Sequence, residues 1–497
     1  MGQSEFMKKL LKKIIPDFLL SRYHWKLALL GALIYGFPSR KLKVIGVTGT
    51  KGKSTVVVLA GKILAEKFTS PPADAKAMAG KHPSPYQGEG ENTNPPQPSL
   101  KGGSGSPPLG GVRGDFTSRV GWISSLSIND GQKEVMNPYH MTMPGRFFIQ
   151  KTLRQMVKND CEYALIEVTS EGIKQHRHKF IKWAGAVFTN LAAEHIEAHG
   201  SFAKYREAKI ELFKAAAKNK DSFGVYNLDD ENVQHFLEPN VKNKYGYSLK
   251  IQNPKSKFQI KSKIQISNIK LSASGSEFEI DGVKFKTNLL GEFNVANCAA
   301  AITMGQACGV SLETAKKALE KIKSIPGRLE IIDEGQNFTV VVDLAHTPDS
   351  FEKVFALFKS LLASSKSRIL RDEGGSHDRI ISVFGSAGGG RDRWKRPELG
   401  RIASQNSDIL IVCNEDPYDE SSEKIAREIC AGCKFTKPEI TLDRRQAIVR
   451  ALSLAHSGDI VLILGKGTEQ TMVIGGKKYE WDDREVVKEE LRKIFQK

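Results

Sequence analysis

A glycine-rich turn between a hydrophobic strand and a hydrophobic helix constrains the fold of this chain more than any other stretch. The segment GVTGTKGKST, residues 46–55, precedes the apolar run 56–60. Backbone N–H groups at a helix start bind phosphate, a lysine reaches the β- and γ-phosphate oxygens, and a hydroxyl binds Mg²⁺. The residues that meet these needs are Gly49, Thr50, Gly52, Lys53, Ser54 and Thr55. Although Val47 breaks the strict P-loop pattern, the turn predicts a nucleotide site.

Short β-rich runs alternate with helical patterns along the chain. The runs are 44–47, 163–168, 186–189, 339–343, 380–384, 409–413 and 460–464. Such alternation predicts parallel sheets covered by helices, with ligands beyond the carboxyl ends of the strands. Residues 250–286 alternate polar and apolar side chains, which predicts antiparallel hairpins between the helical units. We expect an α/β fold, with a P-loop central domain that has a parallel sheet and inserted β-hairpins, and a C-terminal Rossmann-like α/β domain.

A length of 497 residues predicts two or three domains. We expect a basic, apolar N-terminal helical segment over 1–43, a central ATP-binding domain over 44–326 and a C-terminal domain over 327–497. Residues 70–115 are rich in Pro, Gly and Ser, and the tripeptide Phe-Thr-Ser occurs at 68–70 and again at 116–118. This composition predicts a disordered insertion. A second, smaller insertion is expected over 364–377.

The N-terminal segment is basic and apolar together. Of the net charge of +18, half comes from residues 1–53, which contain eleven basic and two acidic residues. Apolar and basic positions alternate at helical spacing at Leu10, Leu11, Ile14, Phe18 and Leu19, with Lys8, Lys9, Lys12 and Lys13 between them. The longest uncharged run, 27–39, is too short to span a membrane. Two interpretations stay open: a helix over residues 5–40 on an anionic membrane surface, or a helix docked on the protein's own body.

Composition also limits the compartment and the partners. Six scattered cysteines predict a reducing, cytoplasmic environment rather than a disulfide framework. The positive charge leaves open a nucleic-acid-binding ATPase, but the chain offers no recognisable nucleic-acid module. We therefore expect no nucleic-acid partner.

Seven sequence blocks accompany the glycine-rich turn in a fixed order. They read IEVTSEGIKQHR, VFTNLAAEHIEAHGSFAKYREAKIELF, LLGEFNVANCAAAI, IPGRLEI, VDLAHTPDS, VFGSAGGGRDRWKRPELG and LGKGTE. Together with a P-loop of the form T-G-T-x-G-K-[ST], they resemble the Mur ligases, the ATP-dependent amide-forming enzymes of peptidoglycan synthesis, over about residues 44–490. Within that family the chain is most similar to members that add the third residue of the peptide stem. Folylpolyglutamate synthases share the fold and much of the P-loop and remain an alternative.

The resemblance implies a reaction through an acyl phosphate, with ATP and two Mg²⁺ sites. Transfer of the γ-phosphoryl group to a carboxylate gathers anionic oxygens, so cations must surround the site. The implied catalytic residues are Lys53, Glu167, His195 and Lys209. The implied metal ligands are Ser54, Glu167, His195 and Lys209, the last as a carbamate. Taken singly, Glu167 could cap the next helix, His195 could be a core histidine, and Lys209 could be a solvated helix residue.

Further residues are implied for the nucleotide and the two other substrates. On the nucleotide side they are Asn294, Asn297, Arg328, Asp343, His346 and Lys395, of which Asn297 and Asp343 could equally be caps. For the muropeptide they are Thr142, Thr169, Gln175 and Arg177. For the incoming amino acid they are Arg391, Asp416, Gly465 and Glu469, with Arg391 suited to pair the carboxylate.

The chain departs from the family pattern at both substrate ends. Tyr418 stands where enzymes that add meso-diaminopimelate have Arg, so lysine or another amino acid becomes possible, and Thr468 replaces the usual His. About 43 residues precede the P-loop, and they show no pattern of the family's uridine-diphosphate-binding domain. The acceptor is therefore expected to be a nucleotide-linked muropeptide or, as an alternative, a lipid-linked one at the inner membrane face. We expect a monomer.

Overall fold

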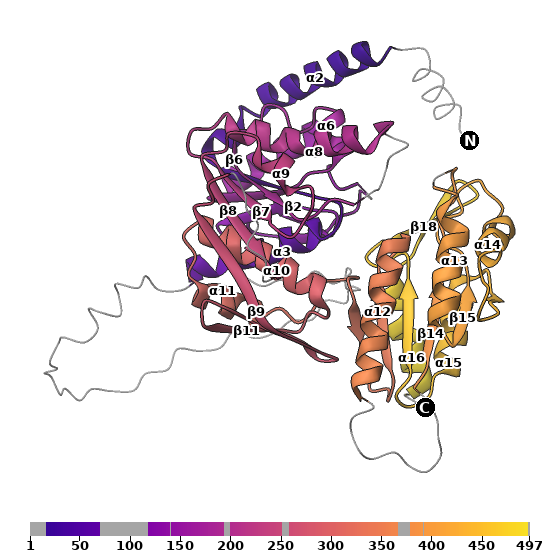
Figure 1. The fold of residues 1–497 in the computed structure, drawn as a ribbon. Coiled ribbons are helices and arrows are strands. Elements are labelled where there is room, and N and C mark those ends of the chain that lie inside the picture. The colour runs from indigo at the N-terminus through magenta and orange to yellow at the C-terminus, as the bar shows by residue number, and fades with distance from the viewer. Residues whose placement is uncertain are drawn as a thin grey trace, which may run out of the picture.

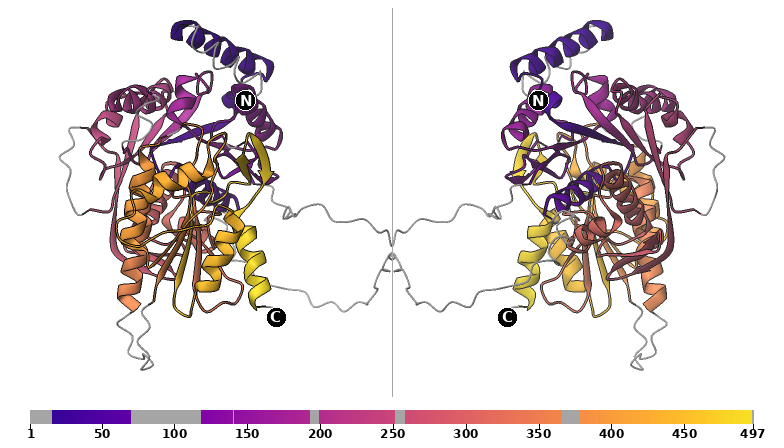
Figure 2. Two further views of the ribbon diagram at one scale, coloured as in Figure 1. Left: turned by 90° about the vertical axis from the view of Figure 1, so that its right-hand side faces the viewer. Right: turned by 90° about the vertical axis from the view of Figure 1, so that its left-hand side faces the viewer.

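The computed structural model describes residues 16–69, 118–139, 141–192, 199–250, 258–365, 378–390 and 392–495. The predicted insertion at 70–115, most of the second one, and the candidate residues His195 and Arg391 lie outside these ranges. The described chain forms a larger central unit, indigo to rose in Figure 1, and a C-terminal unit in orange and yellow beside it. Figure 2 shows both units from the sides.

The central unit is built on an 11-stranded sheet in the order β11-β10-β9-β8-β7-β6-β1-β5-β2-β3-β4. Its middle strands are parallel: β1 (Lys43–Thr48), β2 (Val120–Ile123), β5 (Tyr163–Glu167), β6 (Trp183–Phe188), β7 (Phe223–Asn227) and β8 (Asn243–Ser248). The antiparallel edges are β3 (Ser127–Asn129) with β4 (Glu134–Met136) and β9 (Ser262–Ser272) with β10 (Gly275–Ile280) and β11 (Val283–Thr287). The predicted hairpins therefore continue the same sheet, because β9 pairs in parallel with β8.

Helices cover both faces of this sheet. One face packs against α3 (Lys53–Thr69), α10 (Glu292–Ala307) and α11 (Leu312–Glu320), and the other against α5 (Arg146–Lys158), α6 (Ser170–Lys174), α8 (Phe202–Ala217) and α9 (Val233–Leu237). Strand β1 shows the alternation that requires two layers: Ile45 and Val47 enter one core, and Val44 enters the other. The predicted α/β fold is confirmed.

The C-terminal unit has a six-stranded sheet in the order β12-β13-β17-β14-β15-β16. The strands are β12 (Glu330–Ile332), β13 (Thr339–Asp343), β14 (Ile380–Phe384), β15 (Ile409–Val412), β16 (Glu439–Ile440) and β17 (Ile460–Leu464), and β12 alone is antiparallel to its neighbour. Helices α12 (Pro348–Ser365), α13 (Lys395–Asn406) and α14 (Ser422–Cys430) cover one face, and α15 (Arg444–Leu454) and α16 (Asp483–Phe495) cover the other. A hairpin of β18 (Thr471–Ile474) and β19 (Lys477–Glu480) follows β17.

Helix α2 (Asp17–Ile34) lies along the outside of the central unit, at the top of Figure 1, and a short 3-10 turn η1 (Pro38–Lys41) connects it to β1. One side of α2 packs on α5, with Ala28 and Ala32 buried, and the other side is exposed. The helix is therefore docked on the body while an apolar face stays open to solvent. Within the described ranges no helix is both long enough and apolar enough to cross a membrane.

Candidate active site

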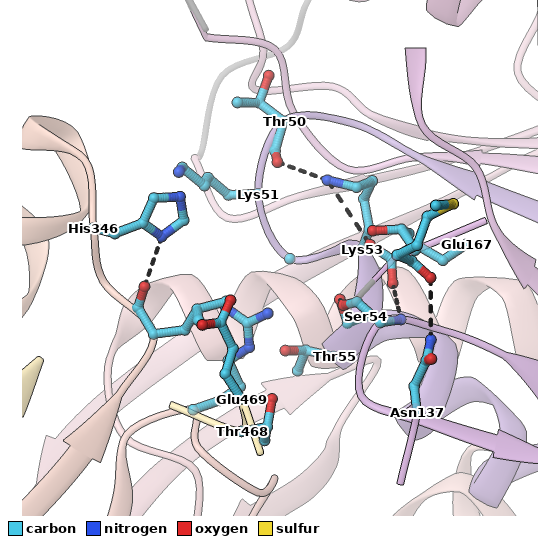
Figure 3. A pocket seen from close by; sticks show the side chains of 16 residues that line it. Thr50, Lys51, Lys53, Ser54, Thr55, Asn137, Glu167, His346, Thr468 and Glu469 are labelled. Carbon is cyan, nitrogen blue, oxygen red and sulfur yellow. Dashed lines mark hydrogen bonds and ion pairs between the residues drawn. The ribbon is translucent and has the colours of Figure 1, made fainter. Parts of the chain in front are cut away.

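The glycine-rich turn lies at the carboxyl end of β1 and opens helix α3. Lys53 Nζ donates a hydrogen bond to the Thr50 carbonyl oxygen at 2.8 Å and lies 4.0 Å from Glu167 Oε1. Figure 3 shows Lys53 and Glu167 pointing toward one another across this end of the cavity. The turn is fixed from β6, since Thr50 N donates to the Asn190 carbonyl oxygen and Lys51 N donates to Asn190 Oδ1. A cation thus lies at the start of a helix, where a phosphate chain would bind.

Two glycines in the turn are required by geometry. Gly52 has a φ of +79°, and a Cβ there would lie 2.2 Å from Asn297 Oδ1. A Cβ on Gly49 would lie 2.0 Å from Thr189 Oγ1. Asn297 is inside α10 and donates to Asn294 Oδ1, while Asn294 donates to the Leu290 carbonyl oxygen. Neither asparagine is a helix cap. Asn297 packs against Gly52 of the P-loop, and Asn294 holds Asn297 in place.

Oxygen ligands gather beside Lys53. Ser54 Oγ lies 2.7 Å from Ser125 Oγ, and the Ser125 backbone N–H donates to Glu167 Oε2 at 2.8 Å. Glu167 ends β5 and does not cap the next helix, because Thr169 caps α6. Hydroxyl and carboxylate oxygens are what Mg²⁺ prefers. These residues fit Mg²⁺, although the described residues contain no cluster of three or more His, Cys, Asp or Glu side chains that could bind a metal.

Lys209 lies directly under the turn. Its side chain is 2% exposed, and its Nζ donates to the Gly49 carbonyl oxygen at 2.6 Å. The Tyr205 ring lies 4.6 Å from the same nitrogen, and the Tyr205 hydroxyl is 3.2 Å from Thr50 Oγ1. Lys209 is therefore not a solvated helix residue. A carbamate on Nζ would keep one N–H for the Gly49 carbonyl, so the contact is compatible with the predicted modification.

The C-terminal unit completes one side of the cavity. Asp343 ends β13 and accepts from Leu329 N and Ala345 N, both at 2.7 Å. Burial raises the pKa of Asp343, and Arg328 opposes that rise. His346 Nδ1 lies 2.8 Å from the Leu344 carbonyl oxygen, and Arg328 and His346 both line the cavity. Asp343 therefore orders the turn that presents Arg328, rather than capping a helix.

The two units meet around a cavity of ≈ 280 Å³. Its lining residues are Thr50, Lys51, Gly52, Lys53, Ser54, Thr55, Ser125, Asn137, Met141, Thr142, Glu167, Arg328, Leu344, His346, Thr468 and Glu469 (Figure 3). Lys51 Nζ donates to Thr347 Oγ1 at 3.1 Å, which links the P-loop directly to the start of α12. Residues from the carboxyl ends of both sheets thus face one space.

A charged cluster lies beside this cavity in the C-terminal unit. Lys466 is fully buried, and its Nζ donates to Asp416 Oδ2 at 3.0 Å and to Glu469 Oε2 at 2.9 Å. Glu415 is buried against Gly465, where a Cβ would lie 2.7 Å from Glu415 Oε2. Burial raises the pKa of Glu415, and Lys395, itself buried, and Lys466 oppose the rise. The cluster combines the predicted residues Asp416, Gly465, Glu469 and Lys395.

The residues expected to read the muropeptide all belong to the central unit. Thr142 lines the cavity. Thr169 is the N-cap of α6, and its Oγ1 accepts from Gly172 N at 3.0 Å. Arg177 donates to Gln175 Oε1 at 2.6 Å and to the Met143 carbonyl oxygen, and burial lowers the pKa of Arg177. Thr169 therefore has a structural role in the described chain, whereas Gln175 and Arg177 form one polar pair.

Sequence reasoning missed four residues that the fold brings to the site. Ser125 joins Ser54 to Glu167, Tyr205 covers Lys209, Thr347 binds Lys51, and Lys466 pairs two carboxylates. Lys466 carried a signal, because it stands inside the GKGTE block beside Glu469. Tyr205 and Thr347 also stand inside quoted blocks, AKYREAK and VDLAHTPDS, whereas Ser125 has no local signature.

Comparison with known proteins fits this geometry. Residues 116–305 match the Mur ligase middle domain, and residues 327–467 match the Mur ligase, glutamate ligase domain. The chain is 35% identical over 466 residues to the UDP-N-acetylmuramyl-tripeptide synthetase of Borreliella afzelii. This alignment covers 92% of the chain and 78% of that synthetase. The chain belongs to the Mur ligase family. This Mur ligase is accordingly an ATP-dependent amide ligase of a family that uses Mg²⁺ in peptidoglycan synthesis.

Two further proteins resemble this Mur ligase. It is 29% identical to the UDP-N-acetylmuramoyl-L-alanyl-D-glutamate--2,6-diaminopimelate ligase 1 of Clostridium acetobutylicum, over 94% of this chain and 82% of that one. Among solved structures, folylpolyglutamate synthase of Mycobacterium tuberculosis, complexed with ADP and AMPPCP, matches with a TM-score of 0.61 and 14% identity over 97% of this chain and 99% of that one. The second likeness concerns the fold alone.

Proposed function

We propose that this Mur ligase adds the third amino acid of the peptidoglycan stem to a UDP-N-acetylmuramoyl-dipeptide. The names of the relatives support the substrate class. The observation on which the proposal most depends is the shared cavity, in which Lys53 and Ser54 face Glu167 from one unit while Arg328 and Glu469 approach from the other. Phosphoryl transfer requires this concentration of cations and oxygen ligands around anionic oxygens.

The first half-reaction transfers the γ-phosphoryl group. A carboxylate oxygen of the acceptor attacks the γ-phosphorus, the bond to the bridging oxygen breaks, and ADP leaves with that electron pair. Lys53 stabilises the charge on the phosphate oxygens, and Arg328 contributes from the C-terminal unit. Mg²⁺ bound by Ser54 and Glu167 would neutralise further phosphate charge. A second Mg²⁺ site with His195 and carbamoylated Lys209 is part of the proposal, and His195 lies outside the described residues.

The second half-reaction forms the amide. The amino group of the incoming amino acid attacks the acyl carbon, phosphate leaves with the bonding pair, and the nitrogen loses a proton. Glu469 and Asp416 supply negative charge for a distal ammonium, and Lys466 fixes both carboxylates. Because Tyr418 stands where a second carboxylate would need a cation, we propose a diamino acid with one carboxylate, such as lysine.

The remaining parts of the proposal concern the setting of the enzyme. We propose a cytoplasmic monomer, as expected for this branch of the family. Peripheral contact with an anionic membrane through residues 5–40 would allow a lipid-linked acceptor as a second candidate. The exposed apolar face of α2 is the observation that favours this candidate.

Lys53→Ala tests the proposal. Loss of the Lys53 ammonium, which would stabilise the phosphate oxygens, should lower kcat by at least about 100-fold, the usual effect of removing one preorganised charge stabiliser. Product formation is measured by mass spectrometry with ATP, a panel of amino acids, and nucleotide-linked, lipid-linked and folate acceptors. Lys62→Ala is the matched control, because Lys62 is on the same helix and exposed. A wild-type rate in Lys53→Ala, or a product with folate alone, would refute the assignment.

A further inference from the structure

Helix α2 has a face of exposed apolar side chains that is bordered by cations, which we call the α2 outer face. Its apolar members are Phe18, Leu19, Tyr23, Leu30, Leu33 and Ile34, with exposed fractions from 46% to 62%. At 3.6 residues per turn these positions share one side of the helix with Arg22 and Lys26. No acidic residue occurs in the sequence between 18 and 34. Exposure of such an apolar surface to water is unfavourable, and the charged residues beside it are all basic.

The opposite side of α2 is fixed to the central unit. Ser21 Oγ lies 2.7 Å from His176 Nε2, and His24 Nδ1 lies 2.9 Å from an Arg146 terminal nitrogen. Ala28 and Ala32 are buried against the body. Because both contacts and burial hold this side, the helix cannot rotate to bury its outer face without losing them.

The surface continues from α2 onto the body. The Trp25 and Phe180 rings meet edge to face with centroids 5.1 Å apart. Lys179 and Lys182 flank Phe180 in the sequence, and Lys182 is exposed. Two separate elements therefore present aromatic rings next to ammonium groups, the combination that favours the interface between lipid headgroups and acyl chains.

We propose that the α2 outer face lies on an anionic membrane surface. The charge complements anionic headgroups, the aromatic rings suit the interfacial layer, and the helix does not meet the requirements for crossing a membrane. In Figure 1 helix α2 lies at the top of the central unit, apart from the C-terminal unit, so a membrane at α2 would not lie between the two units.

Docking on this face brings the acceptor side of the cavity to the membrane. Arg146, which binds His24, also donates to the Gln175 carbonyl oxygen at 2.9 Å, and Gln175 pairs with Arg177. One arginine thus connects α2 to the loop expected to read the muramoyl and diphosphate groups. This step rests on the second candidate of the proposed function, and it adds a muropeptide on a lipid diphosphate as an acceptor that the enzyme would meet at the membrane surface.

Vesicle flotation of the full chain tests the docking. Arg22→Glu combined with Lys26→Glu should reduce the partition constant on phosphatidylglycerol-containing vesicles by at least about 30-fold, since each basic residue near the surface raises that constant about fivefold. Lys317→Glu with Lys323→Glu is the matched control, because both lysines are exposed and lie at α11, at the other end of the central unit. Leu30→Gln with Leu33→Gln should weaken binding without any change of charge.

Three outcomes overturn the docking. The first is no preference of the wild type for anionic over pure phosphatidylcholine vesicles, and the second is binding of the Arg22/Lys26 variant equal to that of the wild type. The third is a concentration-dependent dimer in sedimentation that Leu30→Gln with Leu33→Gln abolishes. Amide formation on a nucleotide-linked acceptor without vesicles should be the same in the wild type and all three double variants. If no acceptor gives product while flotation behaves as expected, the proposed function fails and the docking stands. If vesicles do not raise the rate on a lipid-linked acceptor in the wild type, the substrate assignment is wrong.

Discussion

Lys209 is a buried side chain that contacts the glycine-rich turn. It is fixed between the Gly49 carbonyl and the Tyr205 ring, directly below the turn that contains Lys53. An ammonium there adds positive charge under the P-loop, whereas a carbamate would place an anion able to bind a metal. The two forms have opposite effects on nearby phosphates, so the chemical state of this nitrogen matters for the reaction.

Lys209→Ala is expected to lower kcat by about 10- to 100-fold, the range for residues that orient a metal or its ligands. Formate or acetate should restore part of the activity by occupying the position of the lost carbamate. Labelled bicarbonate should give a ¹³C carbamate signal in the wild type that the variant lacks. Lys214→Ala, an exposed lysine on the same helix, serves as the control and should behave as the wild type. Full activity of Lys209→Ala, or the absence of both rescue and signal, would exclude the carbamate.

The sequence predicts the part of the site whose residues are adjacent along the chain. The P-loop is contiguous, so the chemistry of Lys53 and Ser54 follows from a single short segment. Ser125 reaches Glu167 across 42 positions, and Lys466 reaches Asp416 across 50. Such pairs depend on which strands become neighbours, and no local pattern specifies that.

At the scale of elements, a buried ion pair attaches two helices to the C-terminal sheet. Arg444 at the start of α15 binds Asp483 at the start of α16 through two hydrogen bonds of 2.8 and 2.7 Å, and neither side chain is exposed. Arg444 also donates to the Leu464 carbonyl oxygen at the end of β17. Burial tends to raise the pKa of Asp483, but Arg444 prevails and the pKa lies below its ordinary value.

Arg444→Met should destabilise the C-terminal unit by about 3–5 kcal/mol at pH 7, because it leaves a buried carboxylate without its partner. In the wild type the lowered pKa of Asp483 contributes stability above the unfolded pKa, and this contribution is lost as pH falls through the folded value. In the variant the unpaired Asp483 takes up a proton more easily, so the deficit should shrink as the solution is acidified.

Thermal and urea unfolding between pH 4 and pH 8 would measure both effects. Arg450→Met is the control, because Arg450 is on the same helix but forms an exposed pair with Glu439, and its loss should cost less than about 1 kcal/mol. Equal unfolding curves for the two variants would show that the buried pair does not stabilise the unit.

The elements themselves were largely predictable, and their partners were not. Alternating polar and apolar residues over 250–286 predicted strands, and β9, β10 and β11 lie there. Strand β9 runs parallel to β8 and so extends the main sheet. This pairing depends on the path of the connection between them, which the alternation of polar and apolar residues does not specify. For the N-terminal helix the sequence does not decide between a membrane surface and the protein's own body, because a helix that is basic and apolar together suits both.

At the scale of the whole molecule, the two units are joined by a few specific contacts. Leu290, which precedes α10, is buried in the core of the C-terminal unit, and Lys51 binds Thr347. The charged groups on the two sides of the cavity act together only while the units keep this arrangement. Closure over a reactive acyl phosphate excludes water, which would otherwise hydrolyse it.

Thr347→Val should weaken this arrangement by removing the acceptor for Lys51, at a cost of about 1.5–3 kcal/mol for a hydrogen bond to a charged group. We expect a kcat/KM for ATP lower by about tenfold or more, and a larger radius of gyration in small-angle scattering with a non-hydrolysable ATP analogue. The melting temperature should fall slightly, because Thr347 Oγ1 also accepts from Ser350 N at the start of α12. Thr441→Val is the control, because the Thr441 hydroxyl is in the same unit and donates to the exposed Glu439 Oε1 at 3.5 Å. An unaltered KM and scattering curve would show that the contact does not influence closure.

Helix α3 has a consequence for experiments on this enzyme. It begins at the P-loop and ends at Thr69, and β2 resumes at Val120, which pairs with Tyr163 as Lys43 does. The Phe68 ring lies 4.8 Å from the Arg119 guanidinium, so the end of α3 and the start of β2 are close together. They lie at the amino-terminal end of the parallel strands, opposite the nucleotide turn. The end of α3 is about 25 Å from Lys53, because α3 has 17 residues and rises about 1.5 Å per residue. A fluorophore or affinity handle introduced between these ends would report on the enzyme from a position remote from its chemistry.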